Sequence, residues 1–246
     1  MNDIKVLYED DDILVLDKPS GVIVNKADTT KGELTVQDWL EKRWQATNDE
    51  WRMADKESDF YKRAGIVHRI DKETSGILVV AKNLLSFTNL QAQFKDRKVE
   101  KTYVALAHGR VEPIEGEISV PVGRLPWNRS RFGVLAGGKE AVTKYKAIGN
   151  FWSPIKKQEQ LTLLELYPKT GRTHQIRVHL KYINHPIFGD ELYAGRKTSR
   201  DDRKILPRFF LHAKTINFFH PKTGKRVKFE SELPEELQNI VDVLSR

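Results

Sequence analysis

The chain has 246 residues, with 42 Lys or Arg against 34 Asp or Glu, a formal net charge of +8 and no Cys. The lack of Cys excludes a disulfide framework, a thiol nucleophile and a zinc site held by thiolates. The start, MNDIKVLYEDDD, is acidic where a signal peptide would be basic, and the longest apolar run, residues 77–81, is too short to cross a bilayer. We therefore expect a cytoplasmic protein. Its basic charge favours a polyanionic partner, with an ordinary solvated basic surface as the alternative.

The first hundred residues have the pattern of short strands and two helices. Runs of β-branched and aliphatic side chains predict strands at 4–8, 13–17, 65–70 and 76–81. Thr35 is a capping residue that precedes apolar side chains at helical spacing, which predicts a helix, and a second helix is predicted from residue 84 to near 97. After the first of these helices, residues 45–63 form a polar insert of mixed charge.

The rest of the chain continues the same alternation. Strands are predicted at 102–107, 142–148, 161–167, 209–219 and 226–230. A helix is predicted over residues 173–183 with Thr173 as its cap, and a last helix begins at Pro234. Two segments rich in Arg and Lys, 124–139 and 195–208, are predicted to be basic loops. With no repeat and no flexible linker, one domain is the simplest organisation.

Two polar clusters stand next to apolar runs. The first, HRIDKETSG at 68–76, is a charged turn between two expected strands, where an Asp on a rigid scaffold is well placed to act on a ligand. The alternative is a turn that satisfies only its own backbone. The second, KTGRTHQIRVH at 169–179, gathers basic side chains around a helix start, with a solvated basic face as the alternative.

Together, the two clusters resemble the paired signatures of the RluA-type pseudouridine synthases, H-R-L-D-x-x-T-S-G-x-L and G-R-T-H-Q-I-R-V-H. Further stretches similar to that family follow in the family's order: LYEDDDILVLDKPSG, KTYVAL, HPIFGDELY and FLHAKTINFFHP. The resemblance spans residues 4–230, and its departures are Ile70, where Leu is usual, and the insert at 45–63. It implies an α+β pseudouridine synthase fold with peripheral helices and loops around a central mixed, largely antiparallel sheet, crossed by a catalytic cleft. Because the pattern starts at residue 4, we expect a single catalytic domain over 1–246, without the S4-like domain of many relatives.

The same resemblance implies an RNA pseudouridine synthase, an isomerase that converts uridine to pseudouridine in structured ribosomal or transfer RNA and needs no cofactor. Asp71 is then the catalytic carboxylate, either as a nucleophile at the ribose or as the base that removes a ribose proton. Arg177 is implied as its counter-charge, because a nearby guanidinium keeps a carboxylate ionised. Tyr103 is implied to stack on the uracil and to serve proton transfer, with a Tyr in the core or at an interface as the alternative.

Substrate-binding residues are implied by their positions in the same motifs. The target base must leave its stack before it reacts, and Arg69 is expected to fill the space that the base vacates. Leu211 is expected to form a wall of the base pocket, with a plain core Leu as the alternative. The other expected contacts come from the two signatures: His68, Thr74, Arg172 and His174. The two basic loops are expected to grip the RNA backbone, with solvated mobile loops as the alternative.

Five His residues raise the question of a metal site: His68, His174, His179, His185 and His212. No H-E-x-x-H pairing is present, and His174 and His179 would diverge by about 140° around a helix, so no metal is expected. Two functions compete with the isomerase. One is a non-catalytic RNA-binding or chaperone protein on the same fold, and the other is a glycosidase or nucleosidase, which normally uses a pair of carboxylates. We expect a monomer that binds RNA and no membrane.

Overall fold

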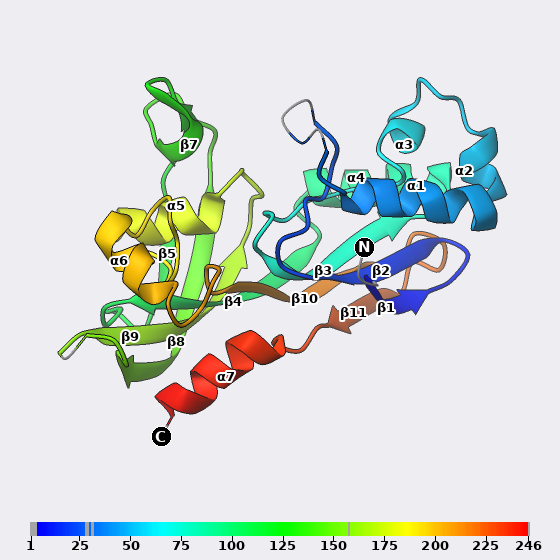
Figure 1. Ribbon diagram of the computed structural model, residues 1–246. Coiled ribbons are helices and arrows are strands. Elements are labelled where there is room, and N and C mark those ends of the chain that lie inside the picture. The colour runs from blue at the N-terminus through cyan, green and yellow to red at the C-terminus, as the bar shows by residue number, and fades with distance from the viewer. Residues whose placement is uncertain (1–3, 28–29, 31, 157, 246) are drawn as a thin grey trace. The chain divides into compact units, whose positions relative to one another are not determined.

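The computed structural model describes residues 4–27, 30, 32–156 and 158–245, and the chain divides into two compact units (Figure 1). Unit 1 combines the residues up to Glu100 with Thr215–Glu232, and unit 2 combines Lys101–Lys214 with the segment from Leu233 onward. The expectation of a single catalytic domain stays a prediction. In the described part of the chain, no helix is long and apolar enough to cross a membrane.

Unit 1 is built on antiparallel strands. β1 (Lys5–Glu9), β2 (Ile13–Lys18) and β3 (Ser75–Ala81) pair in that order, and β11 (Arg226–Glu230) pairs with the second half of β10 (Leu211–Phe219). Nearly all side chains of β2 and all those of β3 are buried, which explains why these two strands appear in the sequence as unbroken apolar runs. The strands expected in these regions are therefore confirmed, with small shifts of their ends.

The helices of unit 1 begin at residues that cap them. Before α1 (Val36–Thr47), Thr35 Oγ1 accepts a hydrogen bond from Asp38 N, and the Asp38 carboxylate accepts one from Thr35 N. Asn83 caps α4 (Leu84–Lys95) in a similar way. Both predicted helices are confirmed.

The polar insert at 45–63 contains two short helices, α2 (Asp49–Met53) and α3 (Asp59–Lys62). The rings of Trp51 and Tyr61 stack with centroids 4.6 Å apart. This contact joins α2 to α3, and Trp51 is 2% exposed.

The strand expected at 65–70 is wrong. In this fully described segment, Ile66 forms an isolated bridge to Val80 of β3 instead of a ladder. Ala64 and Gly65 have φ values of 48° and 78°, which lie outside the extended conformation of a strand. The apolar side chains of the segment, Ile66, Val67 and Ile70, are still buried, so the apolar pattern predicted burial correctly and backbone conformation incorrectly.

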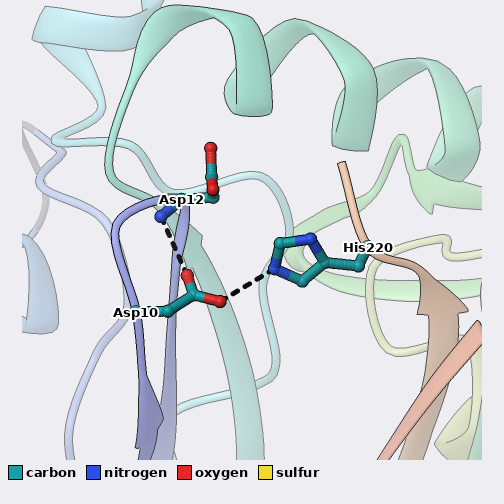
Figure 2. Close-up of side chains that lie close together, drawn as sticks. All are labelled: Asp10, Asp12 and His220. Atoms are coloured by element: carbon teal, nitrogen blue, oxygen red, sulfur yellow. Dashed lines mark hydrogen bonds and ion pairs between the residues drawn. The ribbon is translucent and has the colours of Figure 1, made fainter. Parts of the chain in front are cut away.

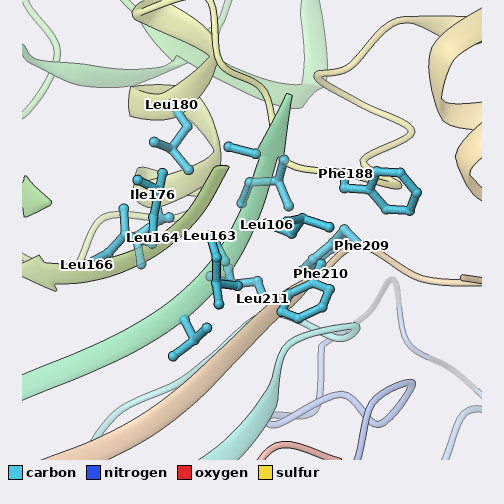
Figure 3. Packing of buried hydrophobic residues seen from close by; sticks show 14 of the residues in the cluster. Leu106, Leu163, Leu164, Leu166, Ile176, Leu180, Phe188, Phe209, Phe210 and Leu211 are labelled. Carbon is cyan, nitrogen blue, oxygen red and sulfur yellow. The ribbon is translucent and has the colours of Figure 1, made fainter. Parts of the chain in front are cut away.

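Unit 2 holds a second antiparallel set of strands around a large apolar core. β4 (Glu100–His108), β9 (Gln160–Pro168), β8 (Val142–Trp152) and β5 (Glu115–Ser119) pair in that order. Side chains of β4 and β9 pack with those of α5 (Gln175–Tyr182) and with the Phe-rich segment that leads into β10 (Figure 3). Leu237 and Ile240 of α7 (Glu235–Leu244) join the same core. The α+β class and the largely antiparallel pairing are confirmed, and the cleft across the sheet stays a prediction.

Both segments expected as basic loops contain regular structure. The segment 124–139 includes most of the hairpin formed by β6 (Val122–Leu125) and β7 (Asn128–Val134), and 195–208 includes α6 (Arg196–Asp202). The residues that α6 buries are Ser199 and Asp202. Because these are polar, a search for apolar periodicity does not detect the helix.

Candidate active site

Asp71 lies in the turn before β3, and the segment after β2 holds that turn by its main chain. Gly21 N donates to Lys72 O at 2.9 Å, and the Ser20 hydroxyl donates to Glu73 O at 2.9 Å. Gly21 has a φ of 85°, a conformation that favours glycine. The segment 18–21, which directly follows the strand predicted at 13–17, therefore anchors the turn of the first signature.

Lys18 is the strongest of these anchors, and sequence reasoning assigned it no role. Its side chain is fully buried, and its ammonium donates to Pro19 O, Val22 O and Lys72 O at 2.8, 2.9 and 3.0 Å. An ammonium is buried only where polar partners replace water, and three carbonyls match its three donors. The signal that could have identified it is a Lys directly before Pro at the end of an apolar strand.

The turn itself leaves Asp71 half-buried, with its main-chain oxygen accepting a hydrogen bond from Thr74 N at 3.1 Å. The side chain of Thr74 is buried, and its hydroxyl has no hydrogen-bond partner among the described residues. An unsatisfied buried hydroxyl costs about 1–3 kcal/mol, so this atom is set up to accept or donate a bond to an added group. Arg69, by contrast, is exposed to solvent.

His68 is anchored to the scaffold. Its Nε2 accepts a hydrogen bond from Val79 N of β3 at 2.9 Å, and its ring stacks on Phe94 of α4 with centroids 4.7 Å apart. Since Nε2 is an acceptor, the neutral ring carries its hydrogen on Nδ1. These contacts fix the start of the signature on β3, and the substrate-binding role of His68 stays a prediction.

The second signature starts α5 at Gln175, and Thr173 does not cap the helix as predicted. The preceding residue, His174, is left-handed with φ 56° and ψ 17°, and its side chain makes no cap hydrogen bond. Gln175 instead ties the turn to its surroundings: its Oε1 accepts from the Thr170 hydroxyl and Arg172 N, and its Nε2 donates to Val142 O and the Thr143 hydroxyl. A buried amide with these four partners fixes the start of the helix rigidly.

Arg177 is buried, which overturns the alternative of a solvated basic face for this residue. Its Nε and Nη2 donate to Oδ2 and Oδ1 of Asp190 at 2.7 and 2.9 Å, and the two side chains are 6% and 0% exposed. The guanidinium carbon also lies 4.4 Å from the Phe209 ring centroid and 5.0 Å from that of Tyr193. The sequence predicted no role for Asp190, which occurs in the HPIFGDELY stretch.

His174 and Arg172 lie at the edge of the same region. His174 Nδ1 is 2.9 Å from Tyr193 Oη, and that hydroxyl also accepts from Phe132 N of the β6–β7 hairpin at 3.1 Å. Arg172 Nε donates to Glu140 O at 3.0 Å. Tyr193 thus links the hairpin to the second signature, while the roles of His174 and Arg172 toward substrate stay predictions.

His179 has a structural environment. It is fully buried, with Nδ1 3.0 Å from the Thr143 hydroxyl and Nε2 3.2 Å from Val120 O. Because a carbonyl only accepts, Nε2 carries the hydrogen and Nδ1 accepts from Thr143. Burial lowers the pKa of His179 and favours this neutral form, although the hydrogen bond to Val120 acts in the opposite direction.

One group of described residues, Asp10, Asp12 and His220, has ligand atoms close enough together for a metal ion (Figure 2). Asp10 Oδ2 accepts from His220 Nε2 at 2.8 Å, while Oδ1 accepts from the Asp12 and Ile13 amides. His220 Nδ1 accepts from the amides of Lys222 and Thr223, so neither ring nitrogen presents a lone pair to a cation. The group therefore links the β1–β2 turn to the turn after β10.

The last two expected site residues lie on strands of unit 2. Tyr103 on β4 is opposite Leu166 of β9 and packs against the core with part of its surface exposed. Two positions earlier on the same face of β4, burial lowers the pKa of Lys101 to about 8. Leu211 is 3% exposed within the core shown in Figure 3, and its role as a pocket wall stays a prediction.

The candidate site residues fall on both units, and the comparisons with known proteins cover both. A model of the RNA pseudouridylate synthase family matches residues 12–182. An uncharacterized RNA pseudouridine synthase of Bacillus subtilis is 37% identical over 247 residues, or 99% of this chain and 74% of the relative. Ribosomal large subunit pseudouridine synthase D of Pseudomonas aeruginosa is 35% identical, over 98% of this chain and 72% of the relative.

A solved structure agrees with these sequence relatives. Human RNA pseudouridylate synthase domain containing 1 matches with a TM-score of 0.70 at 25% identity, over 99% of this chain and 95% of the human one. The span matched by the family model includes Asp71, Tyr103 and Arg177. The resemblance found in the two signatures is thereby confirmed: the chain belongs to the RluA-type RNA pseudouridylate synthases, isomerases that act on uridine in RNA.

Proposed function

We propose that this enzyme forms pseudouridine in the RNA of the large ribosomal subunit, and that it works in the cytoplasm as a monomer without metal or cofactor. The choice of RNA is supported by the relative from Pseudomonas aeruginosa, because its name specifies that subunit. The match to this relative covers 98% of the present chain. The net charge of +8 is suited to a phosphate-rich partner. Transfer RNA is the other substrate class that the sequence leaves open.

We propose further that Asp71 is the catalytic carboxylate. The reaction breaks the bond between N1 and C1′, turns the uracil, forms a bond between C5 and C1′, and moves a proton from C5 to N1, so no atoms are gained or lost. An ionised Asp can start this sequence as a nucleophile at C1′ or as the base that takes a ribose proton. The anchoring of its turn by Lys18 and Gly21 supports the role, because catalytic groups need a fixed position.

Arg177 is proposed to keep that carboxylate ionised, and Tyr103 to stack on the uracil and serve proton transfer. The burial of the Arg177 guanidinium supports its role, since a charge out of water acts more strongly on a neighbouring group. The unsatisfied hydroxyl of Thr74 is a candidate contact for the substrate. Arg69 is proposed to fill the space left by the flipped base, and its exposure leaves it accessible to RNA.

The choice of RNA is tested by mapping pseudouridine in ribosomal and transfer RNA from cells with and without this gene, and from cells that carry only the Asp71→Asn form. We expect one or more sites in large-subunit RNA to lose pseudouridine in both altered strains. Loss confined to transfer RNA would overturn the ribosomal assignment. Unchanged modification with Asp71→Asn would overturn the catalytic role of Asp71.

A further inference from the structure

Asp190 makes more contacts than a partner that only neutralises Arg177 would need. Its Oδ2 accepts from Arg177 Nε at 2.7 Å, and its Oδ1 accepts from Arg177 Nη2 at 2.9 Å. The same Oδ1 also accepts from the amides of Leu192 and Tyr193 at 3.0 and 3.2 Å. The carboxylate is therefore fixed by the backbone on one side and holds the guanidinium in one plane on the other.

The backbone that presents Asp190 is itself constrained. Gly189 has a φ of 78°, and a Cβ there would lie 2.4 Å from Arg208 O, so the chain passes too close for any side chain. Asp190 N donates to Ile187 O at 3.2 Å, and Asp190 O accepts from Ala194 N at 2.9 Å. The backbone of this turn therefore holds the carboxylate in position without any contribution from Arg177.

Two apolar rings limit the guanidinium further. Its carbon is 4.4 Å from the Phe209 ring centroid and 5.0 Å from that of Tyr193. Asp190 accepts from two of the five N–H groups of Arg177, those on Nε and Nη2. Because the guanidinium is planar, this bidentate contact and the two rings fix the plane in which its other N–H groups lie.

Stability alone is a weak explanation for this ion pair. Burying both charges has a large desolvation cost, and replacing a buried pair by apolar side chains is often neutral or stabilising. Asp190 offsets part of the charge of Arg177 at longer range. In its proposed role, Arg177 then depends on the direction of its N–H groups as well as on its charge.

We propose that Asp190 is a positioning residue for the isomerisation: it orients the Arg177 guanidinium and has no contact of its own with the reacting atoms. This inference rests on the proposed role of Arg177. It assigns to the G-D pair of HPIFGDELY a function in catalysis that acts through another side chain.

The test measures single-turnover rates at saturating RNA and, separately, the dissociation constant for the same RNA. Asp190→Asn keeps the shape of the side chain and removes its charge, and we expect the rate to fall about 10- to 100-fold through misorientation of Arg177. The dissociation constant should change by no more than about twofold, since no phosphate contact is lost. Asp190→Glu keeps the charge and should recover part of the rate.

Asp202→Asn is the matched control. Asp202 is another buried Asp of unit 2, but it pairs with His108 at 2.9 Å and accepts from Gly189 N, which an Asn oxygen can still do. Thermal unfolding of both variants measures the loss of stability. We expect Asp202→Asn to lower the unfolding temperature and to keep a rate within about threefold of wild type at a temperature where it is folded.

A double-mutant cycle with Arg177→Lys identifies the route of the effect, because Lys cannot make the bidentate contact. In the Arg177→Lys background, Asp190→Asn should lower the rate by no more than about twofold. Two outcomes would overturn the positioning role of Asp190 and leave the proposed role of Arg177 intact. One is an equal loss of rate from Asp190→Asn in both backgrounds. The other is a near wild-type rate for Asp190→Asn beside an impaired Arg177→Lys. A wild-type rate for Arg177→Lys would overturn the proposed role of Arg177 and the inference with it.

If Asp190→Asn does not fold, the cycle with Asp190→Glu decides. A loss of rate with Asp190→Glu that disappears in the Arg177→Lys background supports the positioning role. A loss that persists there, or a wild-type rate with Asp190→Glu beside an impaired Arg177→Lys, contradicts it.

Discussion

The turn that carries Asp71 and the surroundings of Arg177 are held by different kinds of interaction. Around Asp71 the anchors bind main-chain oxygens, those of Lys72 and Glu73, so the identity of these side chains matters little. Around Arg177 the anchor is a carboxylate, and two rings pack beside it. The first arrangement tolerates substitution within the turn and depends on the segment that grips it. The second depends on particular side chains and is changed by a single substitution.

The largest effect is expected from Asp71→Asn, which keeps the turn and removes the reactive carboxylate. The isomerisation rate should fall at least about 10³-fold, because an essential group contributes several kcal/mol to lowering the barrier. The dissociation constant for RNA and the unfolding curve should stay close to wild type. Residual turnover within about tenfold of wild type would show that Asp71 is not the catalytic carboxylate.

Arg177→Ala removes the side chain on which the second arrangement depends, and we expect a rate loss of about 100-fold at neutral pH. In the proposed role the guanidinium stabilises the ionised form of Asp71 that the reaction requires, so the loss should appear in the single-turnover rate at saturating RNA. An unchanged rate at saturating RNA together with uniformly weaker RNA binding would identify Arg177 as a phosphate contact.

Lys18→Met tests the hydrogen bonds by which the Lys18 ammonium anchors the Asp71 turn. The substitution removes the buried ammonium and its hydrogen bonds to three carbonyls, so the free energy of unfolding should fall by about 3 kcal/mol. Urea denaturation measures this change. The control is Lys72→Met, whose side chain is 48% exposed and pairs with Glu33 at the surface, and which should change stability by less than about 1 kcal/mol. Equal losses for the two variants would refute the anchoring role of Lys18.

The smallest effect is expected from the exposed cations of α6 and its end, Arg196, Arg200 and Lys204, which line a surface hollow with a volume of about 440 Å³. Replacing all three with Gln should reduce the salt slope of log K for RNA by about two, with the single-turnover rate unchanged. Arg203 is the control, because its Nε donates to Gly189 O and its Nη1 to Pro207 O. Arg203→Gln should alter stability and leave the slope as it is. An unchanged slope for the triple variant would direct the search for the RNA contact to the β6–β7 hairpin.

The six cations of the basic loop expected at 195–208 differ in burial and in hydrogen bonding, which their sequence positions do not indicate. Arg208 is 5% exposed and bonds to Phe209 O, Leu211 O and Glu236, and Arg203 is bound as described above. These two side chains stabilise unit 2, so they are removed from the set proposed to bind RNA. The sequence shows that these side chains are charged, but not that they donate hydrogen bonds to main-chain carbonyls.

The sequence by itself determined the features that depend on near neighbours in the chain. The cap at Thr35, the strands around the Asp10 turn, the helix that follows Pro234 and the two signatures are all set within a few residues, because capping and apolar periodicity are local. Only the tertiary structure decided that Lys18 grips Lys72, 54 positions away, and that Asp190 holds Arg177 across 13. These partners meet because the strands and turns bring distant segments together. Their energy comes from desolvation and hydrogen-bond geometry at the meeting point, which no spacing in the sequence encodes.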